Sequence, residues 1–220
     1  RDEFIEQVRQ DCGIGISVLS GDDEAELTYV GATSEFLTGS SENPMAVLDI
    51  GGGSTELTTG VSGNVTSKTS LDLGSVRLTE RILRSSPPSM AALEEAQAEV
   101  SSWTSKLPRL PAHTRLIGVA GTVTTLAAID LKLLQYDRTR VSGYKLTLRS
   151  IDKTWDELRS RTVPEIMRDF PQIEAGRADI IVAGIMILRG AMGVLDADDI
   201  TVSDRGLRYG LALREYSKRR

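Results

Sequence analysis

Apolar and polar positions alternate with two different periods along the chain. Apolar residues that recur every three or four positions indicate amphipathic helices, and short apolar runs bounded by Gly, Ser, Asn or Pro indicate strands. This pattern predicts helices over residues 2–10, 76–83, 89–107, 121–133, 150–161 and 206–216, a helix that follows a turn at 20–24 and runs to residue 36, and helical segments flanking 174–195. Strands are predicted over residues 14–19, 45–50, 56–61, 65–71, 115–119 and 200–203.

The order of these elements predicts the fold class. Three consecutive strands are joined by tight turns at 51–54 and 62–64, and helices then alternate with single strands. The segments 38–44 and 134–144 are polar and predicted to be irregular. The order resembles one ribonuclease H-like half of the actin-like ATPase superfamily, which implies an α/β domain with a mixed sheet of about five strands flanked by helices.

The longest apolar stretch covers residues 180–195, but Arg189 and three glycines interrupt it. It is therefore too short and too broken to span a bilayer, and a buried helix pair is the prediction. The charged N-terminal segment lacks the apolar core of a signal peptide, and the single Cys12 fits a reducing compartment, so the expected location is the cytoplasm.

Charge narrows the classes of partner. The 220-residue chain has a net charge of −5 and a pI near 5.1, which argues against binding of nucleic acid or an anionic membrane through long-range attraction. An anionic substrate would need a local cationic site.

One apolar strand carries an aspartate near its end, directly before a triple-glycine turn. Residues 47–57 read Val-Leu-Asp-Ile-Gly-Gly-Gly-Ser-Thr-Glu-Leu, with Asp49 at the end of the strand that faces the turn. Glycines can adopt positive φ and approach a ligand closely, so successive backbone N–H groups can converge on phosphate oxygens. A hairpin turn with an edge aspartate is the plain alternative. The candidate phosphate-binding residues here are Gly51, Gly52, Gly53, Ser54 and Thr55.

A second glycine-bearing turn joins the strand at 115–119 to the following helix. Residues 119–125 read Val-Ala-Gly-Thr-Val-Thr-Thr, and the free amides and dipole of a helix N-terminus favour an anion. Gly121 and Thr122 are therefore candidate phosphate-binding residues. The alternative is a strand-to-helix turn that Thr122 caps without any ligand.

Four motifs in this order resemble the signatures of the Ppx/GppA family of exopolyphosphatases and guanosine-pentaphosphate phosphatases. Two of them are the turns just described, at residues 48–57 and 119–122. The others are residues 18–25, Val-Leu-Ser-Gly-Asp-Asp-Glu-Ala, and residues 203–210, Ser-Asp-Arg-Gly-Leu-Arg-Tyr-Gly. Residues 177–184 also resemble the family, and the motifs together span nearly all of the chain.

The resemblance implies roles for three carboxylates. Glu24 matches the family's catalytic carboxylate, which would orient or deprotonate the water that attacks the terminal phosphorus, provided that burial or neighbouring acids make it basic enough. An acidic cluster at a helix N-terminus is the alternative. Asp49 matches the position that holds Mg²⁺, with Glu56 as a further acid. Backbone amides and the metal would then neutralise charge during phosphoryl transfer.

The resemblance also points to one arginine. Arg208 is the family's usual arginine in the last motif and is a candidate phosphate ligand, whereas Arg205 occupies a more variable place. Structural ion pairs with neighbouring acids are the alternative for both. Three further arginines, at 77, 81 and 84, form either a basic stripe or a solvated helix face.

The family's first domain opens on an Asp-Ile-Gly-Ser/Thr-Asn-Ser loop that has no match in this sequence. The resemblance therefore implies that residues 1–38 are the end of a first actin-like domain with its linker, that residues 39–220 are a second, ribonuclease H-like domain, and that most of the first domain is absent. In the family the substrate lies between the two domains, so we expect this chain alone to have weak or no turnover.

The implied function is Mg²⁺-dependent release of terminal orthophosphate from inorganic polyphosphate by a cytoplasmic bacterial homodimer. Hydrolysis of guanosine pentaphosphate to the tetraphosphate is the sibling activity, and the motifs do not separate the two. Two other classes stay open: an ATP-binding kinase or ATPase of the same superfold, and a protein that binds phosphate without hydrolysing it.

Overall fold

One mixed sheet forms the centre of the molecule. The computed structural model describes residues 2–37 and 43–219, and its sheet has six strands in the order β3-β2-β1-β4-β6-β5. β1 pairs antiparallel with β2 and parallel with β4, β2 pairs antiparallel with β3, and β6 pairs parallel with β4 and antiparallel with β5. The bounds are β1 (Met45–Ile50), β2 (Thr55–Val61), β3 (Asn64–Leu71), β4 (Arg115–Val119), β5 (Lys145–Thr147) and β6 (Asp199–Val202).

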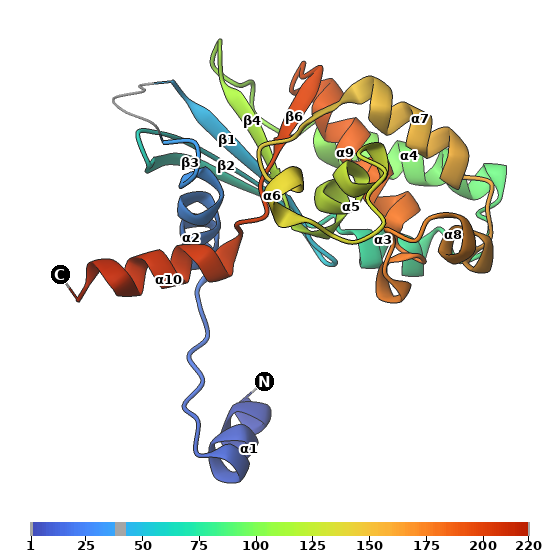
Figure 1. Cartoon of the computed structure of the whole chain (residues 1–220). Coiled ribbons are helices and arrows are strands. Elements are labelled where there is room, and N and C mark those ends of the chain that lie inside the picture. Colours follow the sequence, from blue (N-terminus) through green and yellow to red (C-terminus); the bar gives the residue numbers. More distant parts are fainter. Residues whose placement is uncertain (1, 38–42, 220) are drawn as a thin grey trace.

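Helices cover both faces of this sheet, which confirms the predicted α/β class (Figure 1). One face carries α2 (Gly21–Thr33) and α10 (Leu207–Ser217), whereas the larger helical layer covers the other. That layer contains α3 (Ser75–Arg81), α4 (Met90–Thr104), α5 (Ala120–Asp130), α7 (Leu148–Leu158), α8 (Val163–Asp169) and α9 (Ile181–Val194). Two short elements, α6 (Arg138–Val141) and the 3₁₀ turn Ala175–Arg177, lie in the connections.

The alternation along β1 divides the core and places one aspartate. Ala46, Leu48 and Ile50 pack with the larger helical layer, whereas Met45 and Val47 pack with Tyr29 and Ala32 of α2. Because successive strand residues point to opposite faces, Asp49 continues the row of Met45 and Val47. The carboxylate of Asp49 therefore lies on the face of the sheet that α2 covers.

The apolar stretch at 180–195 forms one helix and not the predicted helix pair. Most of α9 is buried between its neighbours, its glycines do not end the helix, and two of them, Gly184 and Gly190, serve close packing. Gly190, for example, would place a Cβ atom 2.5 Å from Val100 on α4. Within residues 2–37 and 43–219, no helix combines the length and apolarity needed to cross a membrane.

The strand predicted over residues 14–19 is wrong. This segment is an extended connection, in which Ile14, Ile16 and Val18 are exposed, and it leads to α1 (Asp2–Cys12), which lies apart from the sheet (Figure 1). Alternation alone does not make a strand, because the backbone also needs a hydrogen-bonded neighbour. None of the described strands pairs with this segment.

Other differences are smaller. The segment predicted as irregular at 134–144 contains α6, and the unpredicted β5 directly follows it. These elements are too short to show a period in the sequence. Within the predicted loop at 38–44, residues 38–42 lie outside the described residues, and the chain resumes just before β1.

Helices α2 and α10 cross in van der Waals contact because glycines face one another. A Cβ atom on Gly31 would lie 2.4 Å from the carbonyl oxygen of Gly206, and one on Gly210 would lie 1.8 Å from that of Leu27. Both are far below normal contact distances, so the crossing has no room for a methyl group. α2, which begins close to Glu24, is thereby fixed to the helix that carries Arg208.

This crossing predicts a large effect of one methyl group. Gly210→Ala should lower the free energy of unfolding by about 3 kcal/mol, at the upper end of the usual cost of overpacking, because a backbone carbonyl must move. Gly193→Ala, in α9 with no atom within 4 Å of the new methyl group, is the control and should be neutral or stabilising. Urea unfolding measures both, and equal effects would contradict the packing described.

Candidate active site

A cavity of about 700 Å³ lies between the first turn of α2 and the sheet. Its floor consists of two rows of side chains that run across β1, β2 and β3 on the face covered by α2. In one row Asp49 is paired with Glu56, and Glu56 with Ser70. The neighbouring row contains Val47, Thr58 and Lys68. We call this space the first cavity.

The start of α2 places Glu24 at the first cavity. Ser20 caps the helix, and its Oγ accepts a hydrogen bond from the backbone N–H of Asp23 at 3.0 Å. The N–H of Glu24 donates to the carbonyl oxygen of Ser20 at 3.0 Å, which fixes the backbone that carries this carboxylate. The Glu24 residue is exposed, so the burial expected for it is not present in this structure.

The triple-glycine turn closes one end of the first cavity. The N–H of Gly51 donates to the carbonyl oxygen of Ser54 at 2.9 Å, and Gly51, Gly52 and Ser54 line the cavity. Positive φ, which the glycine run suggested, occurs among the described glycines only at 13, 63 and 143. Close packing requires glycine beside the turn, because a Cβ atom on Gly74 would lie 2.3 Å from the carbonyl oxygen of Gly52, whereas a Cβ atom on Gly52 would lie 3.0 Å from Val76.

Two residues of the predicted phosphate-binding turn face elsewhere. Thr55 is fully buried, and its hydroxyl donates to the carbonyl oxygen of Leu73 at 2.6 Å, so this hydroxyl joins the end of β2 to the segment after β3. A Cβ atom on Gly53 would have Arg77 as its nearest neighbour, at 4.0 Å. The side chain of Thr55 therefore serves the fold, and Ser54 is the hydroxyl at the cavity.

Four acidic side chains and one basic side chain line the first cavity: Asp22, Glu24, Asp49, Glu56 and Lys68. Burial, with the charges of Glu56 and Glu24 as smaller causes, raises the pKa of Asp49 to about 6. Asp49 and Glu56 face each other across an antiparallel pair, an arrangement that is unfavourable for two like charges unless a cation lies nearby. Mg²⁺ accepts one or two protein carboxylates with water and substrate oxygens, so this pair fits it. In the described ranges 2–37 and 43–219, no group of three potential ligands forms a complete protein cage for a metal.

Asp49 also lines a second cavity, of about 260 Å³, beyond the first. This second cavity is bounded by the turn from β4 to α5, by the segment after β6, and by Arg177. Gly121 and Arg208, two of the predicted phosphate ligands, lie at its wall. Thr122 is buried and packs against Gly184 of α9, where a Cβ atom would lie 2.4 Å from the Thr122 hydroxyl oxygen. Among the threonines at the start of α5, Thr124 lines the second cavity.

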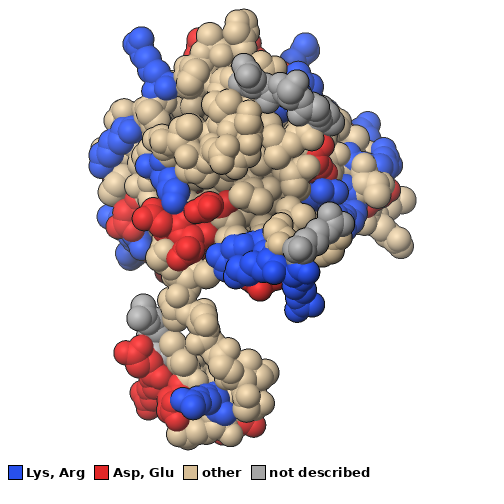
Figure 2. All heavy atoms as spheres, turned by 90° about the vertical axis from the view of Figure 1, so that its left-hand side faces the viewer, with Lys and Arg blue, Asp and Glu red and all other residues tan. Residues whose placement is uncertain are grey.

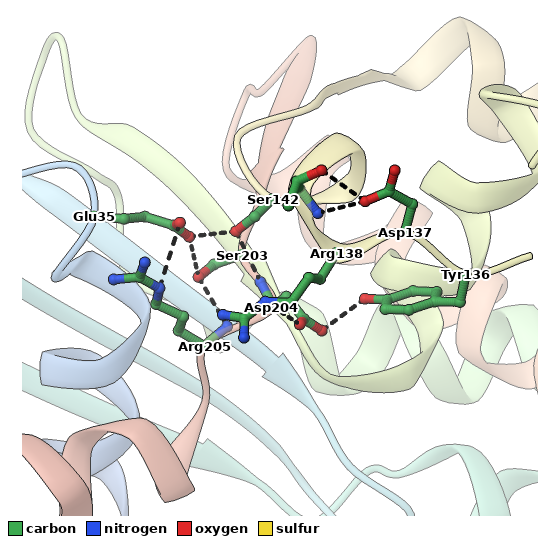
Figure 3. A network of polar contacts seen from close by, with 9 residues as sticks. Glu35, Tyr136, Asp137, Arg138, Ser142, Ser203, Asp204 and Arg205 are labelled. Carbon is green, nitrogen blue, oxygen red and sulfur yellow. Dashed lines mark hydrogen bonds and ion pairs between the residues drawn. The ribbon is translucent and has the colours of Figure 1, made fainter.

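The arginines of the last motif have different surroundings. Arg205 Nε lies 3.5 Å from a carboxylate oxygen of Glu35, and Ser203 Oγ donates to the same carboxylate at 2.9 Å (Figure 3). The ion-pair alternative therefore describes Arg205, which fixes the segment between β6 and α10. Arg208 is exposed at the second cavity.

The three arginines of the predicted basic stripe, on α3 and just after it, already have polar partners within the chain. Arg77 pairs with Asp72, Arg81 lies 3.5 Å from Glu99, and Arg84 donates to a backbone carbonyl. This is the solvated helix face that was the alternative. Local positive charge is nevertheless present, since one face of the molecule shows a compact group of basic side chains beside a compact acidic group (Figure 2).

Comparison with known proteins agrees with this geometry. The model of the Ppx/GppA phosphatase family matches residues 1–219. The chain belongs to this family. A crystallised Ppx/GppA family member from Aquifex aeolicus superposes on this chain with a TM-score of 0.89 at 32% identity, over 99% of this chain and 70% of the relative. The six-stranded α/β domain is therefore a Ppx/GppA fold.

Two curated relatives show how much of a longer protein the match covers. Exopolyphosphatase 2 of Mycobacterium tuberculosis is 33% identical over 211 residues, which cover 91% of this chain and 64% of the relative. The bifunctional 3-dehydroquinate synthase/phosphatase of Fusobacterium nucleatum is 32% identical over 218 residues, 97% of this chain and 32% of the relative. The chain thus spans less than two thirds of either protein.

In this Ppx/GppA chain most of the predicted site residues fall into two neighbouring groups, whereas Gly53, Thr55 and Thr122 line neither cavity. Glu24, Asp49 and Glu56 lie at the first cavity with Gly51, Gly52 and Ser54, whereas Gly121 and Arg208 lie at the second cavity. Their chemical roles stay predictions.

Two basic side chains at these cavities, those of Lys68 and Arg177, were not among the site residues predicted from the sequence. Lys68 Nζ donates to the carbonyl oxygen of Asp22 at 2.9 Å and ties β3 to the start of α2, although 46 positions separate the two residues. A single lysine in a strand carries no signal of such a contact. Arg177 lies within a motif that resembles the family, and its place at the second cavity comes from the fold.

Proposed function

We propose that this chain carries the site of a Mg²⁺-dependent phosphohydrolase that releases terminal orthophosphate from inorganic polyphosphate. The observation that supports this most strongly is that Glu24 lines one cavity with Asp49 and the adjoining glycine turn, although Glu24 comes from a separate part of the sequence. A base, an acidic metal position and a phosphate-sized turn are the parts that phosphoryl transfer to water requires. Guanosine pentaphosphate is the alternative substrate, since the family name covers both activities.

Each residue has a task in this proposal. Glu24 orients the attacking water and accepts its proton, while Ser54 and the amides of the turn bind the oxygens of the terminal phosphate. Asp49 and Glu56 would hold Mg²⁺, which supplies neutralisation of the phosphate charge when bound. Lys68 keeps the first turn of α2 against β3 and so fixes the height of Glu24 above the floor.

We also propose that the first cavity is one wall of a cleft that a further domain completes. Glu24 is exposed, although a catalytic base works best where water is restricted, and the relatives are longer than the matched region. On this proposal residues 1–38 belong to the end of that domain and its linker. The homodimer and the cytoplasmic location implied by the resemblance stay predictions.

Orthophosphate release tests the proposed function. Long-chain polyphosphate, guanosine pentaphosphate and ATP should be compared, with and without Mg²⁺, using the 220-residue chain and a longer family protein that contains it. We expect Mg²⁺-dependent release from polyphosphate by the longer protein and weak or no release by the 220-residue chain alone. Preference for guanosine pentaphosphate would select the sibling activity. Hydrolysis of ATP alone, or of none of the three, would contradict the proposal.

A further inference from the structure

The side chain of Glu35 joins three segments that are far apart in the sequence (Figure 3). Glu35 follows the last turn of α2, and one of its carboxylate oxygens accepts hydrogen bonds from the hydroxyl groups of Ser142 and Ser203. The other oxygen lies 3.5 Å from Nε of Arg205, whose Nη1 donates to Ser34 Oγ at 3.3 Å. Ser142 directly follows α6, whereas Ser203 and Arg205 follow β6. One carboxylate therefore joins the ends of α2, α6 and β6.

This carboxylate is largely shielded from water. The Glu35 side chain is only 18% exposed, and Ser203 is buried. The N–H of Asp204 donates to Ser142 Oγ at 3.3 Å, and the N–H of Arg205 donates to Ser203 Oγ at 3.2 Å. Each hydroxyl thus donates to Glu35 and accepts from the backbone of residues 203–205. Loss of the carboxylate would leave both hydroxyls without their acceptor, which is unfavourable for buried polar groups.

Glu35 lines neither cavity, but the segment that it holds forms a wall of the second. Of residues 203–209, all except Arg205 line this cavity. The guanidinium carbon of Arg205 lies 5.4 Å from the centre of the Tyr209 ring, in the first turn of α10. Arg208 is the neighbour of Tyr209 in that turn. Contacts therefore lead from Glu35 through Arg205 to the part of the wall that carries Arg208.

The turn between β6 and α10 has a charged anchor on each side. Asp204 accepts a hydrogen bond from the Tyr136 hydroxyl at 2.6 Å and lies 3.7 Å from Nε of Arg138. Arg205 is anchored by Glu35. The glycine crossing sets the distance between α2 and α10, whereas these anchors fix the turn that leads into α10. Without Glu35, the Arg205 side of the turn loses its charged partner and the Asp204 side keeps its own.

We propose that Glu35 is a positioning residue that holds Arg208 in place at the second cavity. The inference rests on the proposed function, with Arg208 as a ligand of the phosphate chain, and deepens it by giving the end of α2 a task in substrate binding. α2 then serves both cavities, because Glu24 lies at its start, at the first cavity, and Glu35 follows its end, behind the wall of the second. Loss of Glu35 should weaken substrate binding and leave the chemical step unchanged.

Steady-state orthophosphate release by a longer family protein that contains this chain tests the inference. Glu35→Ala should raise KM for the hydrolysed substrate, polyphosphate or guanosine pentaphosphate, about 10-fold, because a misplaced charged donor loses much of its hydrogen bond to phosphate. The value of kcat should stay within about twofold of the parent value.

Glu99→Ala is the matched control for this variant. A carboxylate oxygen of Glu99 also lies 3.5 Å from an arginine, Arg81, and accepts a hydrogen bond from Trp103 at 3.1 Å. The Glu99 side chain is 29% exposed, against 18% for Glu35, and it lines neither the first nor the second cavity. Its substitution should therefore leave KM within about twofold of the parent value.

A double-mutant cycle with Arg208 separates positioning from a general loss of packing. Arg208→Gln removes the guanidinium that Glu35 holds in place, so Glu35→Ala should raise KM less than about twofold further in that background. A role of Glu35 that does not act through Arg208 would give effects that multiply. Glu35→Gln keeps an acceptor for the two hydroxyls and should raise KM less than Glu35→Ala. If melting temperatures show that Glu35→Ala does not fold, Glu35→Gln replaces it in the cycle.

The outcomes distinguish this inference from the proposed function. Equal KM values for Glu35→Ala and Glu99→Ala, effects that multiply with Arg208→Gln, or an Arg208→Gln variant with the KM of the parent would overturn the inference and leave the function standing. If the longer protein releases no orthophosphate, the proposed function fails, and the Kd of inorganic tripolyphosphate, measured by calorimetry, replaces KM in the same comparisons. A parent protein that neither releases orthophosphate nor binds tripolyphosphate would overturn both.

Discussion

Glu24→Gln is expected to lower kcat for orthophosphate release from polyphosphate by roughly 10²- to 10⁴-fold, the usual contribution of a positioned general base, with KM nearly unchanged. The amide has the size of the carboxylate but cannot accept the proton of the attacking water. Because the proposed function assigns binding of the phosphate chain to the glycine turn and to arginines, loss of this carboxylate should leave affinity intact. The measurement is steady-state orthophosphate release by a longer family protein that contains this chain.

Glu26→Gln is the matched control for this variant. Glu26 lies on the same helix, is exposed, and lines neither cavity. It removes the same charge from α2 without touching the site, so kcat should stay within about twofold of the parent value, as is usual for exposed positions. Comparable losses in both variants would mean that the negative charge of α2 matters and that Glu24 is not the base.

Asp49→Asn is expected to remove the response to Mg²⁺ and to stabilise the metal-free protein at neutral pH. Burial raises the pKa of Asp49 to about 6 in the folded chain, so the folded state holds this proton more tightly than the unfolded state does. The parent chain should therefore gain stability as pH falls from about 7 towards 4, and ionised Asp49 costs up to roughly 3 kcal/mol above that window. At pH 8 the variant should unfold at a higher urea concentration than the parent, and near pH 4 the difference should vanish.

Asp199→Asn provides the control for the aspartate substitution. Asp199 lies on β6, outside both cavities, and its carboxylate is 3.2 Å from Lys145. Its substitution removes an exposed ion pair and should give no gain at pH 8. Added Mg²⁺ should raise the melting temperature of the parent and of Asp199→Asn but not that of Asp49→Asn. A parent chain less stable at pH 5.5 than at pH 8 would contradict the environment described for Asp49.

Local sequence carried the information for part of this site. Asp49 could be placed because an apolar strand ends at this residue directly before the triple-glycine turn, whereas Glu24 was a candidate through the resemblance of residues 18–25 to the family. Both conclusions need only a few neighbouring residues. The six-stranded sheet was also predictable in class, since the runs at 45–50, 56–61 and 65–71 are separated by tight turns.

The rest of the site could not be predicted, because it depends on contacts between segments that are distant in the sequence. Lys68 reaches Asp22, and Arg177 reaches the turn at Gly121, only after the sheet and its helices have packed. The same limit explains why Thr55 and Thr122 were wrongly placed at a cavity. Both belong to motifs predicted to bind phosphate, but their side chains are buried in the core. The segment at 14–19 alternates like a strand, yet a strand also requires a partner, which periodicity does not reveal.

The most direct test of the central claim is the position of metal and phosphate in a crystal of the Glu24→Gln variant of a longer family protein, grown with Mn²⁺ and tripolyphosphate. Anomalous scattering identifies the metal, and the inactive variant preserves the substrate. We expect Mn²⁺ beside Asp49 and Glu56, with the terminal phosphorus between the turn at Gly51 to Ser54 and the side chain at position 24. Metal bound away from Asp49, or a terminal phosphate that does not reach the first cavity, would contradict it.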